Sequence, residues 1–282
     1  MDFIDWVKEI DTYIAHKHPE LLHVFRIYSG EALFARKLID INLAKLPHNA
    51  KILEVGAGMF LLSCWLHREG YNIHALEPIG NGFGHFEQLS EIVLQHAGDY
   101  VPPIIRSKAE ELRISAEFDF AFSLNVMEHV SDISLVIQNV VRSLKPSGYY
   151  RFICPNYAFP YESHFNIPTL INKPITYKIF RSRILRPNQF FDADGMWDSI
   201  NWITISRIKQ ACNSNLNCDF SRAAFLQYLE RISDEKFLKR KGWLGKIINI
   251  LGTSKLQKIF ALFPLYFLPI IDCRTHKNQN HL

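Results

Sequence analysis

The chain has 282 residues, 48% hydrophobic and 21% charged, which is ordinary for a globular protein and long enough to bury a full core. Its longest apolar run, residues 259–271, has 13 residues and is too short to span a membrane. The five cysteines form no C-x-x-C pair and the acidic N-terminus lacks a signal-peptide pattern, so we expect no disulfide framework or zinc knuckle and a cytoplasmic location.

The charge is unevenly distributed. Residues 1–155 hold 14 Lys and Arg against 19 Asp and Glu, whereas residues 156–282 hold 18 against 9. Net charges of −5 and +9 fit two interpretations, a second half that faces an anionic partner or a solvated basic surface.

In chain order, residues 1–46 form an apolar helical stripe that ends near Pro47. Five short apolar strands follow, at 51–53, 71–76, 104–106, 118–124 and 149–154. The clearest helix between them covers 133–144, where apolar residues recur at steps of three and four. With further strands at 216–225 and 270–274, the pattern predicts an α/β fold with a doubly wound, mostly parallel, seven-stranded sheet.

Residues 157–200 interrupt this alternation. Prolines at 160, 168, 174 and 187 break up an aromatic-rich stretch, which we interpret as a lid inserted over the site. The predicted organisation is a helical N-terminal segment, a cofactor-binding core, the lid insertion, and a C-terminal part of the sheet with a basic, apolar cap, at residues 1–46, 47–156, 157–200 and 201–282.

The most informative segment is Lys51 to Gly58, in which a buried strand runs into Glu54 and then into the turn Gly56-Ala57-Gly58. Glycine adopts positive φ and has no Cβ, so this turn can press its backbone against a ligand. The next long strand ends in Glu77, where a carboxylate can accept hydrogen bonds from two ribose hydroxyls. Together these features predict a nucleoside-binding unit.

Two ligand classes use such a unit. A dinucleotide-binding fold has a third glycine at the position that Leu61 occupies in this chain. A pyrophosphate would also repel the nearby anion of Glu54. The same anion would attract an ammonium group. S-adenosylmethionine carries an ammonium and a ribose and no phosphate, so the residues favour it, and a dinucleotide-dependent oxidoreductase is the alternative.

Residues 50–156 resemble the core of class I S-adenosylmethionine-dependent methyltransferases, in the broad group that includes ubiquinone-biosynthesis and sugar methyltransferases. The resemblance rests on the glycine turn, on Ala109-Glu110-Glu111-Leu112, and on Lys145 to Gly148 followed by a strand and Pro155-Asn156. It implies that Ala109 and Glu110 receive the adenine. The chain departs from the family at Phe60, where a third glycine is frequent, and at Lys108, where many members have an aspartate.

The segment Asn125 to His129 follows the fourth strand. It partly resembles the E-x-x-E-H element of quinone and small-RNA O-methyltransferases, in which acids and a histidine hold a divalent metal. Here the first acid is Asn125, so only Glu128 and His129 carry over, and a hard cation prefers more oxygen ligands. We therefore predict no metal, with Asn125 at the cofactor, His129 as general base and Glu128 orienting it or the substrate. The alternative is that Glu128 and His129 only cap the following helix, and His164 in the lid is a further residue that can face the substrate.

The predicted activity is methyl transfer from S-adenosylmethionine to a hydroxyl of a glycan, lipid-linked or other small-molecule acceptor. Departures at Phe60, Lys108 and Asn125 leave a non-catalytic cofactor-binding protein as a second alternative. Residues 236–271 contain seven bases, no acid and many apolar side chains, which suits peripheral contact with anionic membrane or packing on the core. No nucleic acid is expected as a partner.

Overall fold

The computed structural model describes residues 1–78, 84–186, 193–212, 216–230 and 262–278. Its strands form one seven-stranded sheet in the order β3-β2-β1-β4-β5-β7-β6. β2 pairs with β1 and β3 in parallel, β1 pairs with β4 in parallel, and β6 pairs with β7 antiparallel. The predicted α/β fold with a mostly parallel, doubly wound sheet is confirmed.

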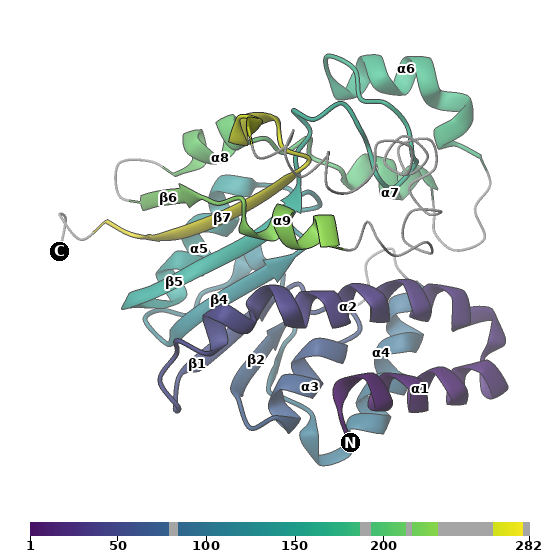
Figure 1. Ribbon diagram of the computed structural model, residues 1–282, viewed down its shortest axis with the longest axis vertical. Helices are drawn as coiled ribbons and strands as arrows, with labels where there is room; N and C mark the ends of the chain where they lie inside the picture. The colour runs from purple at the N-terminus through teal and green to yellow at the C-terminus, as the bar shows by residue number, and fades with distance from the viewer. Residues whose placement is uncertain (79–83, 187–192, 213–215, 231–261, 279–282) are drawn as a thin grey trace. The chain divides into compact units, whose positions relative to one another are not determined.

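The strands are β1 Lys51–Val55, β2 Asn72–Leu76, β3 Ile104–Ile105, β4 Phe118–Leu124, β5 Leu144–Pro155, β6 Leu216–Phe220 and β7 Ile270–Lys277. The α-helices are α1 Phe3–Lys17, α2 Leu22–Leu43, α3 Leu61–Arg68, α4 Gly84–Ala97, α5 Ile133–Ser143, α6 Lys173–Ile184, α7 Ala193–Ser199, α8 Ile205–Ala211 and α9 Ala223–Glu230. Short 3₁₀ turns are η1 Pro19–Leu21, η2 Gly98–Tyr100, η3 Ala109–Glu111 and η5 Leu265–Phe267 (Figure 1).

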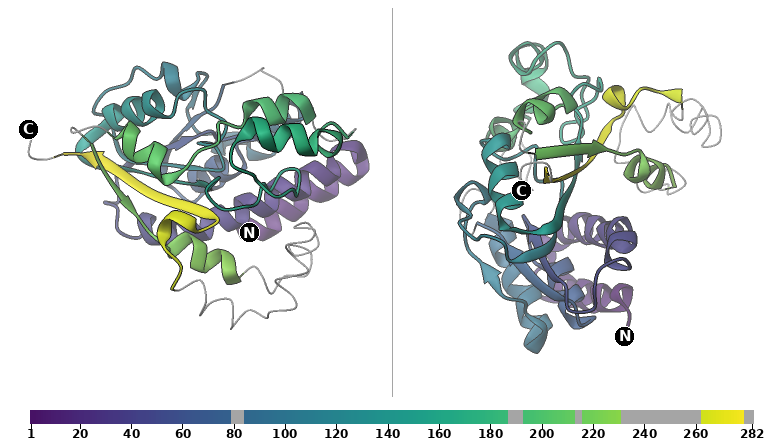
Figure 2. Two further views of the ribbon diagram at one scale, coloured as in Figure 1. Left: turned by 90° about the horizontal axis from the view of Figure 1, so that it is seen from above. Right: turned by 90° about the vertical axis from the view of Figure 1, so that its left-hand side faces the viewer.

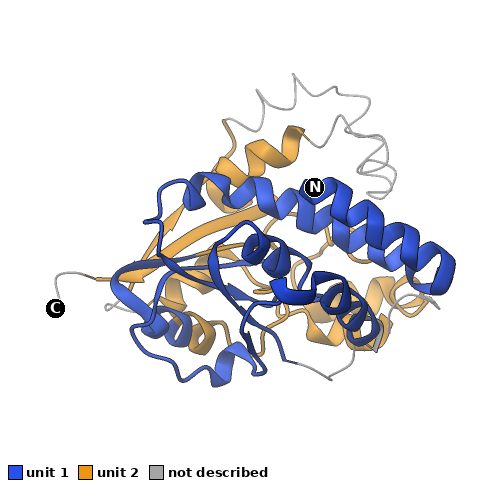
Figure 3. Ribbon diagram, turned by 90° about the horizontal axis from the view of Figure 1, so that it is seen from below, with its two compact units in different colours: residues 1–124, 138–150, 188–192 blue, residues 125–137, 151–187, 193–282 orange. Residues whose placement is uncertain are grey.

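The chain divides into two compact units, coloured separately in Figure 3. Unit 1 comprises residues 1–124, 138–150 and 188–192, and unit 2 comprises residues 125–137, 151–187 and 193–282. Unit 1 carries the glycine turn, and unit 2 carries the segment from Asn125 to His129.

The core of unit 1 forms between its helices and the strands β1, β2 and β4. Phe3 and Trp6 of α1 stack on Trp65 of α3, with ring centroids 5.1 and 6.0 Å from Trp65. Side chains of α2 join the same cluster, among them Phe25, which is fully buried. The long helices α1 and α2 lie side by side in every view of Figures 1 and 2. The helical N-terminus therefore belongs to the frame around the glycine turn.

Unit 2 differs from the sequence prediction in its details. The predicted strand 216–225 ends at Phe220, because α9 begins at Ala223. A further helix, α8, begins at Ile205, where the Thr204 side chain accepts a hydrogen bond from the Arg207 backbone amide. The segment predicted as an irregular lid contains the helices α6 and α7.

Unit 2 is held together by a buried ion pair and a small apolar cluster. Arg151 of β5 and Asp272 of β7 form two hydrogen bonds of 2.9 and 2.8 Å, and both are nearly inaccessible to solvent. Leu268 packs with Phe225 and Leu229. Leu268 and Ile271, at the end of the predicted membrane-contact segment, are therefore core residues. Within the described residues, no helix has the length and apolar character needed to cross a bilayer.

Candidate functional site

The glycine turn of unit 1 has the backbone that its sequence requires. Gly56 and Gly58 have φ values of 73° and 55°, in the left-handed region that favours glycine. The turn is fixed by Gly56 and Ala57, whose amides donate to the Leu76 carbonyl at 2.8 and 3.2 Å. This links the end of β1 to the end of β2, so the turn and the residue after β2 lie together.

Phe60 also has left-handed backbone, with φ 63°, and it precedes the first residue of α3. Glycine adopts this conformation without strain, which fits the glycine that the resemblance implies at this position. The phenylalanine is 1% exposed and belongs to the apolar core of unit 1. The departure from the family pattern therefore keeps the turn geometry and adds a buried ring to the core.

Two acids flank the turn, Glu54 buried and Glu77 half-buried. Glu54, at 6% exposure, accepts a hydrogen bond from the Ser63 hydroxyl, and burial raises its pKa to about 8, with Glu77 nearby adding to the increase. Glu77 accepts from the Gly58 amide at 2.8 Å, and burial raises its pKa to about 7. Sequence reasoning found both acids and missed Ser63, which is nine residues from Glu54 on the first turns of α3.

The Ala109-Glu110 turn is the short helix η3 of unit 1. Asn139 of α5 donates its amide to the carbonyls of Ala109 and Glu110, at 3.3 and 2.5 Å. Arg142 donates to the Leu112 carbonyl at 2.5 Å. Asn139 and Arg142 are thus positioning residues that the sequence analysis missed, because nothing in a helix 30 residues away marks them.

In unit 2 the loop after β4 holds Glu128 and His129. Asn125 has φ 55°, and its amide donates to the Ile153 carbonyl at 2.9 Å. Asn201 fixes the rest of the loop, because its side chain donates to the Met127 and Val130 carbonyls at 2.7 and 2.8 Å. Its backbone amide also donates to the Glu128 carbonyl at 2.8 Å. The loop is held from both of its ends.

Glu128 is fully buried, and neither of its carboxylate oxygens has a hydrogen-bond partner within the described part of the chain. Burial raises its pKa to about 7. Its Oε1 is 3.9 Å from Nε2 of His129, which is too long for a hydrogen bond. The structure therefore assigns no orienting hydrogen bond from Glu128 to His129.

Ser199 orients His129 instead. The Ser199 hydroxyl donates to the Met196 carbonyl at 2.8 Å, so at 2.9 Å from His129 Nδ1 it can only accept the proton of that nitrogen. Nε2 of a neutral ring is then a hydrogen-bond acceptor. Burial lowers the pKa of His129 to about 3, and His164 nearby lowers it further.

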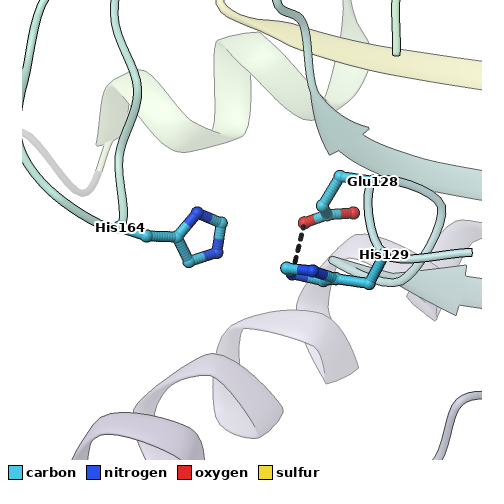
Figure 4. A group of neighbouring side chains, drawn as sticks. All are labelled: Glu128, His129 and His164. Atoms are coloured by element: carbon cyan, nitrogen blue, oxygen red, sulfur yellow. Dashed lines mark ion pairs between the residues drawn. The ribbon is translucent and has the colours of Figure 1, made fainter. Parts of the chain in front are cut away.

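His164 lies beside His129, with the two ring centroids 5.2 Å apart, and it points toward Glu128 and His129 in Figure 4. Its Nδ1 is 2.6 Å from Oε1 of Glu162, which is fully buried. Desolvation would raise the pKa of Glu162, but the interaction with His164 and two backbone amide donors outweigh it, and the pKa lies below its ordinary value.

The structure thus brings together Glu128, His129 and His164, whose potential ligand atoms all lie within 4.8 Å of one another. The sequence marked all three residues, but not their supports Glu162 and Ser199. Ser199 is 70 residues from His129 in the sequence, and no local pattern connects them. Tertiary contacts alone identify the two supporting residues.

Comparison with known proteins agrees with this geometry. A family profile described as "Methyltransferase domain" matches residues 53–152. Residues 53–152 therefore form an S-adenosylmethionine-dependent methyltransferase domain, whose cofactor is S-adenosylmethionine. The alternative of a dinucleotide-dependent oxidoreductase is therefore excluded.

The proteins similar to this chain match different shares of its length. An uncharacterized protein of Mycobacterium tuberculosis (strain CDC 1551 / Oshkosh) is 41% identical over 276 residues, which is 96% of this chain and 94% of that protein. A ubiquinone biosynthesis O-methyltransferase of Rickettsia typhi is 26% identical over 143 residues, 51% of this chain and 52% of that protein. A crystal structure of an S-adenosylmethionine-dependent methyltransferase from Mesorhizobium loti is 14% identical in sequence to this chain. The match covers 83% of this chain and 94% of the other chain, with a TM-score of 0.48.

Proposed function

We propose that this methyltransferase transfers the methyl group to a hydroxyl oxygen of a small-molecule or lipid-linked acceptor. The observation that carries the proposal is the group of proton acceptors in unit 2. A hydroxyl becomes a good nucleophile when it loses its proton, and Oε1 of Glu128 and Nε2 of His129 lie 3.9 Å apart, with no hydrogen-bond partner for the Glu128 carboxyl among the described residues. The Rickettsia typhi relative is itself named as an O-methyltransferase.

In this proposal the residues of unit 1 hold the cofactor. Glu54 attracts the ammonium group, and the backbone of Gly56, Ala57 and Gly58 lies against the methionine end. Glu77 accepts the ribose hydroxyls in place of its present bond to the Gly58 amide. The turn at Ala109 and Glu110 receives the adenine. Asn125, which follows β4, stays a prediction from the sequence as a cofactor-binding residue.

Glu128 and His129 act on the acceptor hydroxyl in the chemical step. The new O–CH₃ bond forms as the S–CH₃ bond breaks, S-adenosylhomocysteine leaves, and the hydroxyl proton passes to the acceptor groups of unit 2 and then to solvent. Positioning the reacting atoms in line supplies the remainder of the rate enhancement, on the order of 7–11 kcal/mol.

The test is a transfer assay with S-adenosylmethionine labelled in its methyl group. Purified protein is given matched acceptors that differ only in carrying a hydroxyl, an amine or a thiol, on catechol-like, sugar and lipid-linked frames. We expect label on oxygen. Label on nitrogen alone would refute oxygen transfer, and cofactor binding without turnover on every acceptor would favour the non-catalytic alternative.

A specific surface of unit 2 supports a lipid-linked acceptor. Ile175 and Ile179 of α6 are 38% and 60% exposed, and Ile171, just before the helix, is 89% exposed. Residues 163–191 contain five bases and no acid, and four of these bases are exposed at the helix or just beyond it: Lys178, Arg181, Arg183 and Arg186. Arg183, Arg186 and Ser182 line a hollow at the C-terminal end of α6. Exposed apolar side chains among positive charges are complementary to the surface of an anionic bilayer.

This surface differs from the segment that the sequence indicated. Residues 236–261 of that segment lie outside the described residues, and of the remainder Leu262 and Phe267 are 87% and 53% exposed. Co-sedimentation with phosphatidylglycerol vesicles, against phosphatidylcholine vesicles, tests the α6 surface. We expect Ile175→Ser with Ile179→Ser to release the protein from anionic vesicles. The matched pair Ile4→Ser with Ile41→Ser, exposed in unit 1, is expected to leave binding unchanged. Undiminished binding by the α6 variant would contradict the proposal.

A further inference from the structure

The hydrogen bonds around Glu128 leave an electrostatic imbalance. A carboxylate has four lone-pair positions, and burying it without donors costs several kcal/mol. Glu128 is fully buried and has no donor on either oxygen among the described residues. The neighbouring Glu162, equally buried, accepts from the His164 ring and from the amides of His164 and Phe165 at 2.6, 3.1 and 2.7 Å. Unit 2 thus supplies donors to one acid and withholds them from the other.

The two imidazoles face Glu128 with acceptor atoms as well. His129 donates its Nδ1 proton to Ser199, so Nε2 of the neutral ring carries a lone pair, 3.9 Å from Oε1 of Glu128. His164 donates its Nδ1 proton to Glu162, so its Nε2 also carries a lone pair. Three electron-pair donors therefore converge.

We propose that Glu128, His129 and His164 bind a divalent transition-metal cation. The proposal rests on the proposed function and deepens it, because it names how the acceptor-rich site of unit 2 is completed. A proton would neutralise only Glu128, whereas one cation can be bound by the carboxylate and both imidazoles together. Each histidine is also held by a hydrogen bond from its other ring nitrogen, to Glu162 and to Ser199, which is the arrangement that fixes metal-binding imidazoles.

The distances are compatible with a cation. The ligand atoms lie within 4.8 Å of one another, so a cation at their centre would stand at most about 2.8 Å from each. Ligand bonds of about 2.0–2.2 Å then need side-chain shifts below roughly 1 Å, within rotamer adjustment of the three residues. The loop anchored by Asn201 and the segment carrying Ser199 provide the fixed frame.

The donor set selects the kind of cation. Two imidazole nitrogens and one carboxylate suit Zn²⁺, Mn²⁺ or Fe²⁺, whereas Mg²⁺ prefers oxygen ligands and retained water. Three protein ligands also leave coordination positions open, as in catalytic rather than structural sites. A cation here would occupy Nε2 of His129 and act as a Lewis acid that lowers the pKa of the acceptor hydroxyl, so that the second carboxylate oxygen of Glu128 would be left to take the proton. The sequence predicted no metal because its pattern contained only Glu128 and His129, and the third ligand lies 35 residues further along, in the insertion.

Metal binding can be measured without turnover. The full chain is stripped with a chelator, dialysed, and titrated calorimetrically with Mn²⁺, with Zn²⁺ and Mg²⁺ in parallel. Mn²⁺ is the main probe, because the five free cysteines offer Zn²⁺ competing thiolates. We expect one equivalent of Mn²⁺ to bind, and Mg²⁺ to bind at least tenfold more weakly.

Four variants locate the site. Glu128→Gln, His129→Ala and His164→Ala are each expected to weaken Mn²⁺ binding more than tenfold. Glu162→Gln, which weakens the hydrogen bond that supports the His164 ring, is expected to weaken Mn²⁺ binding by about 10–100-fold. His96→Ala, at a histidine of unit 1 that also has a ring hydrogen bond, is the control and is expected to bind like the wild type. Circular dichroism checks that each variant is folded.

The result that overturns the inference is a folded, cofactor-binding wild type that takes up no cation, or uptake that survives all four variants. Failure of this inference and of the proposed function are separable. If oxygen methylation proceeds unchanged in chelator, the cation is not needed and the proposed function stands. If a cation binds but no hydroxyl is methylated, the metal site stands and the proposed function is wrong.

Discussion

The two units treat their buried carboxylates differently. In unit 1, Glu54 accepts from the Ser63 hydroxyl and Glu77 from the Gly58 amide, so each acid has a donor within the chain. In unit 2, Glu128 has none among the described residues, although the equally buried Glu162 has several. An uncompensated buried charge is expensive, so the missing donor of Glu128 marks a place where a ligand or reacting group is needed.

The two units therefore hold their site residues in different ways before a ligand binds. The acids of unit 1 are held in place by bonds within the chain, which ligand hydroxyls can replace. The acceptors of unit 2 are held only through their neighbours, by Ser199 and Glu162, while the acceptor atoms that face each other stay unbonded to one another. We therefore expect substitutions in unit 1 to act on cofactor affinity and substitutions in unit 2 to act on the chemical step.

The largest effect is expected for His129→Ala. Turnover is expected to fall by roughly 10²–10⁴-fold, the range for loss of a group acting on a transferring proton, with cofactor affinity changed less than twofold. Single-turnover kinetics and calorimetric titration with S-adenosylmethionine measure the two quantities separately. His96→Ala again serves as the control. An equal loss of turnover and cofactor affinity would erase the proposed division between the units.

The second prediction concerns the frame of unit 1. Phe60→Gly relieves a left-handed backbone strain of about 1–2 kcal/mol and loses a buried ring contributing about 3–5 kcal/mol, so we expect a net loss of about 1–4 kcal/mol. Phe60→Ala loses the ring and keeps the strain. It is therefore expected to be less stable than the glycine variant, the reverse of the usual order. Urea denaturation measures both, and a more stable alanine variant would show that the backbone at residue 60 is unstrained.

Phe60 also shows where sequence reasoning reaches its limit. The strands, the glycine turn and the residues that follow the strand ends were predictable, because short apolar runs and glycines report local backbone needs. The structure confirms the seven-stranded sheet. At residue 60 the sequence showed only a missing glycine, whereas the structure shows that the backbone is retained and the side chain is used in the core.

The supports of the sites were not predictable. Asn139 holds the Ala109-Glu110 turn from 30 residues away, and Ser199 holds His129 from 70 residues away. Such contacts depend on the tertiary fold, and the periodicity of the sequence does not encode them. The strand predicted at 216–225 failed for a related reason, since Ala223 to Phe225 are apolar enough for a strand but belong to a helix packed on β7.

Glu77→Gln is expected to act on the cofactor alone. A charge-assisted pair of hydrogen bonds to the ribose is lost, so binding of S-adenosylmethionine should weaken by about 1–3 kcal/mol. The amide still fills the space, and its oxygen can accept from the Gly58 amide, so thermal stability should change little. Glu31→Gln, in α2 of unit 1, is the control. Calorimetry that finds unchanged affinity would remove Glu77 from the cofactor site.

The smallest effect is a pH dependence that separates Glu77 from Glu54. Burial raises the pKa of Glu77 to about 7 and that of Glu54 to about 8, so both acids are largely protonated at pH 6. An ionised Glu77 accepts both ribose hydroxyls, and an ionised Glu54 attracts the ammonium group, so cofactor affinity should rise with pH. The rise in affinity is at most about tenfold per pH unit for each acid while the pH is below its pKa.

Measurements from pH 6 to 7.5 stay at or below the range where a free α-amino group of the ligand loses its proton. Over this interval Glu77→Gln should bind with a shallower slope than the wild type, and the slope that remains belongs to Glu54. Identical slopes for the two proteins would mean that Glu77 keeps one protonation state throughout, and its hydrogen bond to Gly58 would then be its main role.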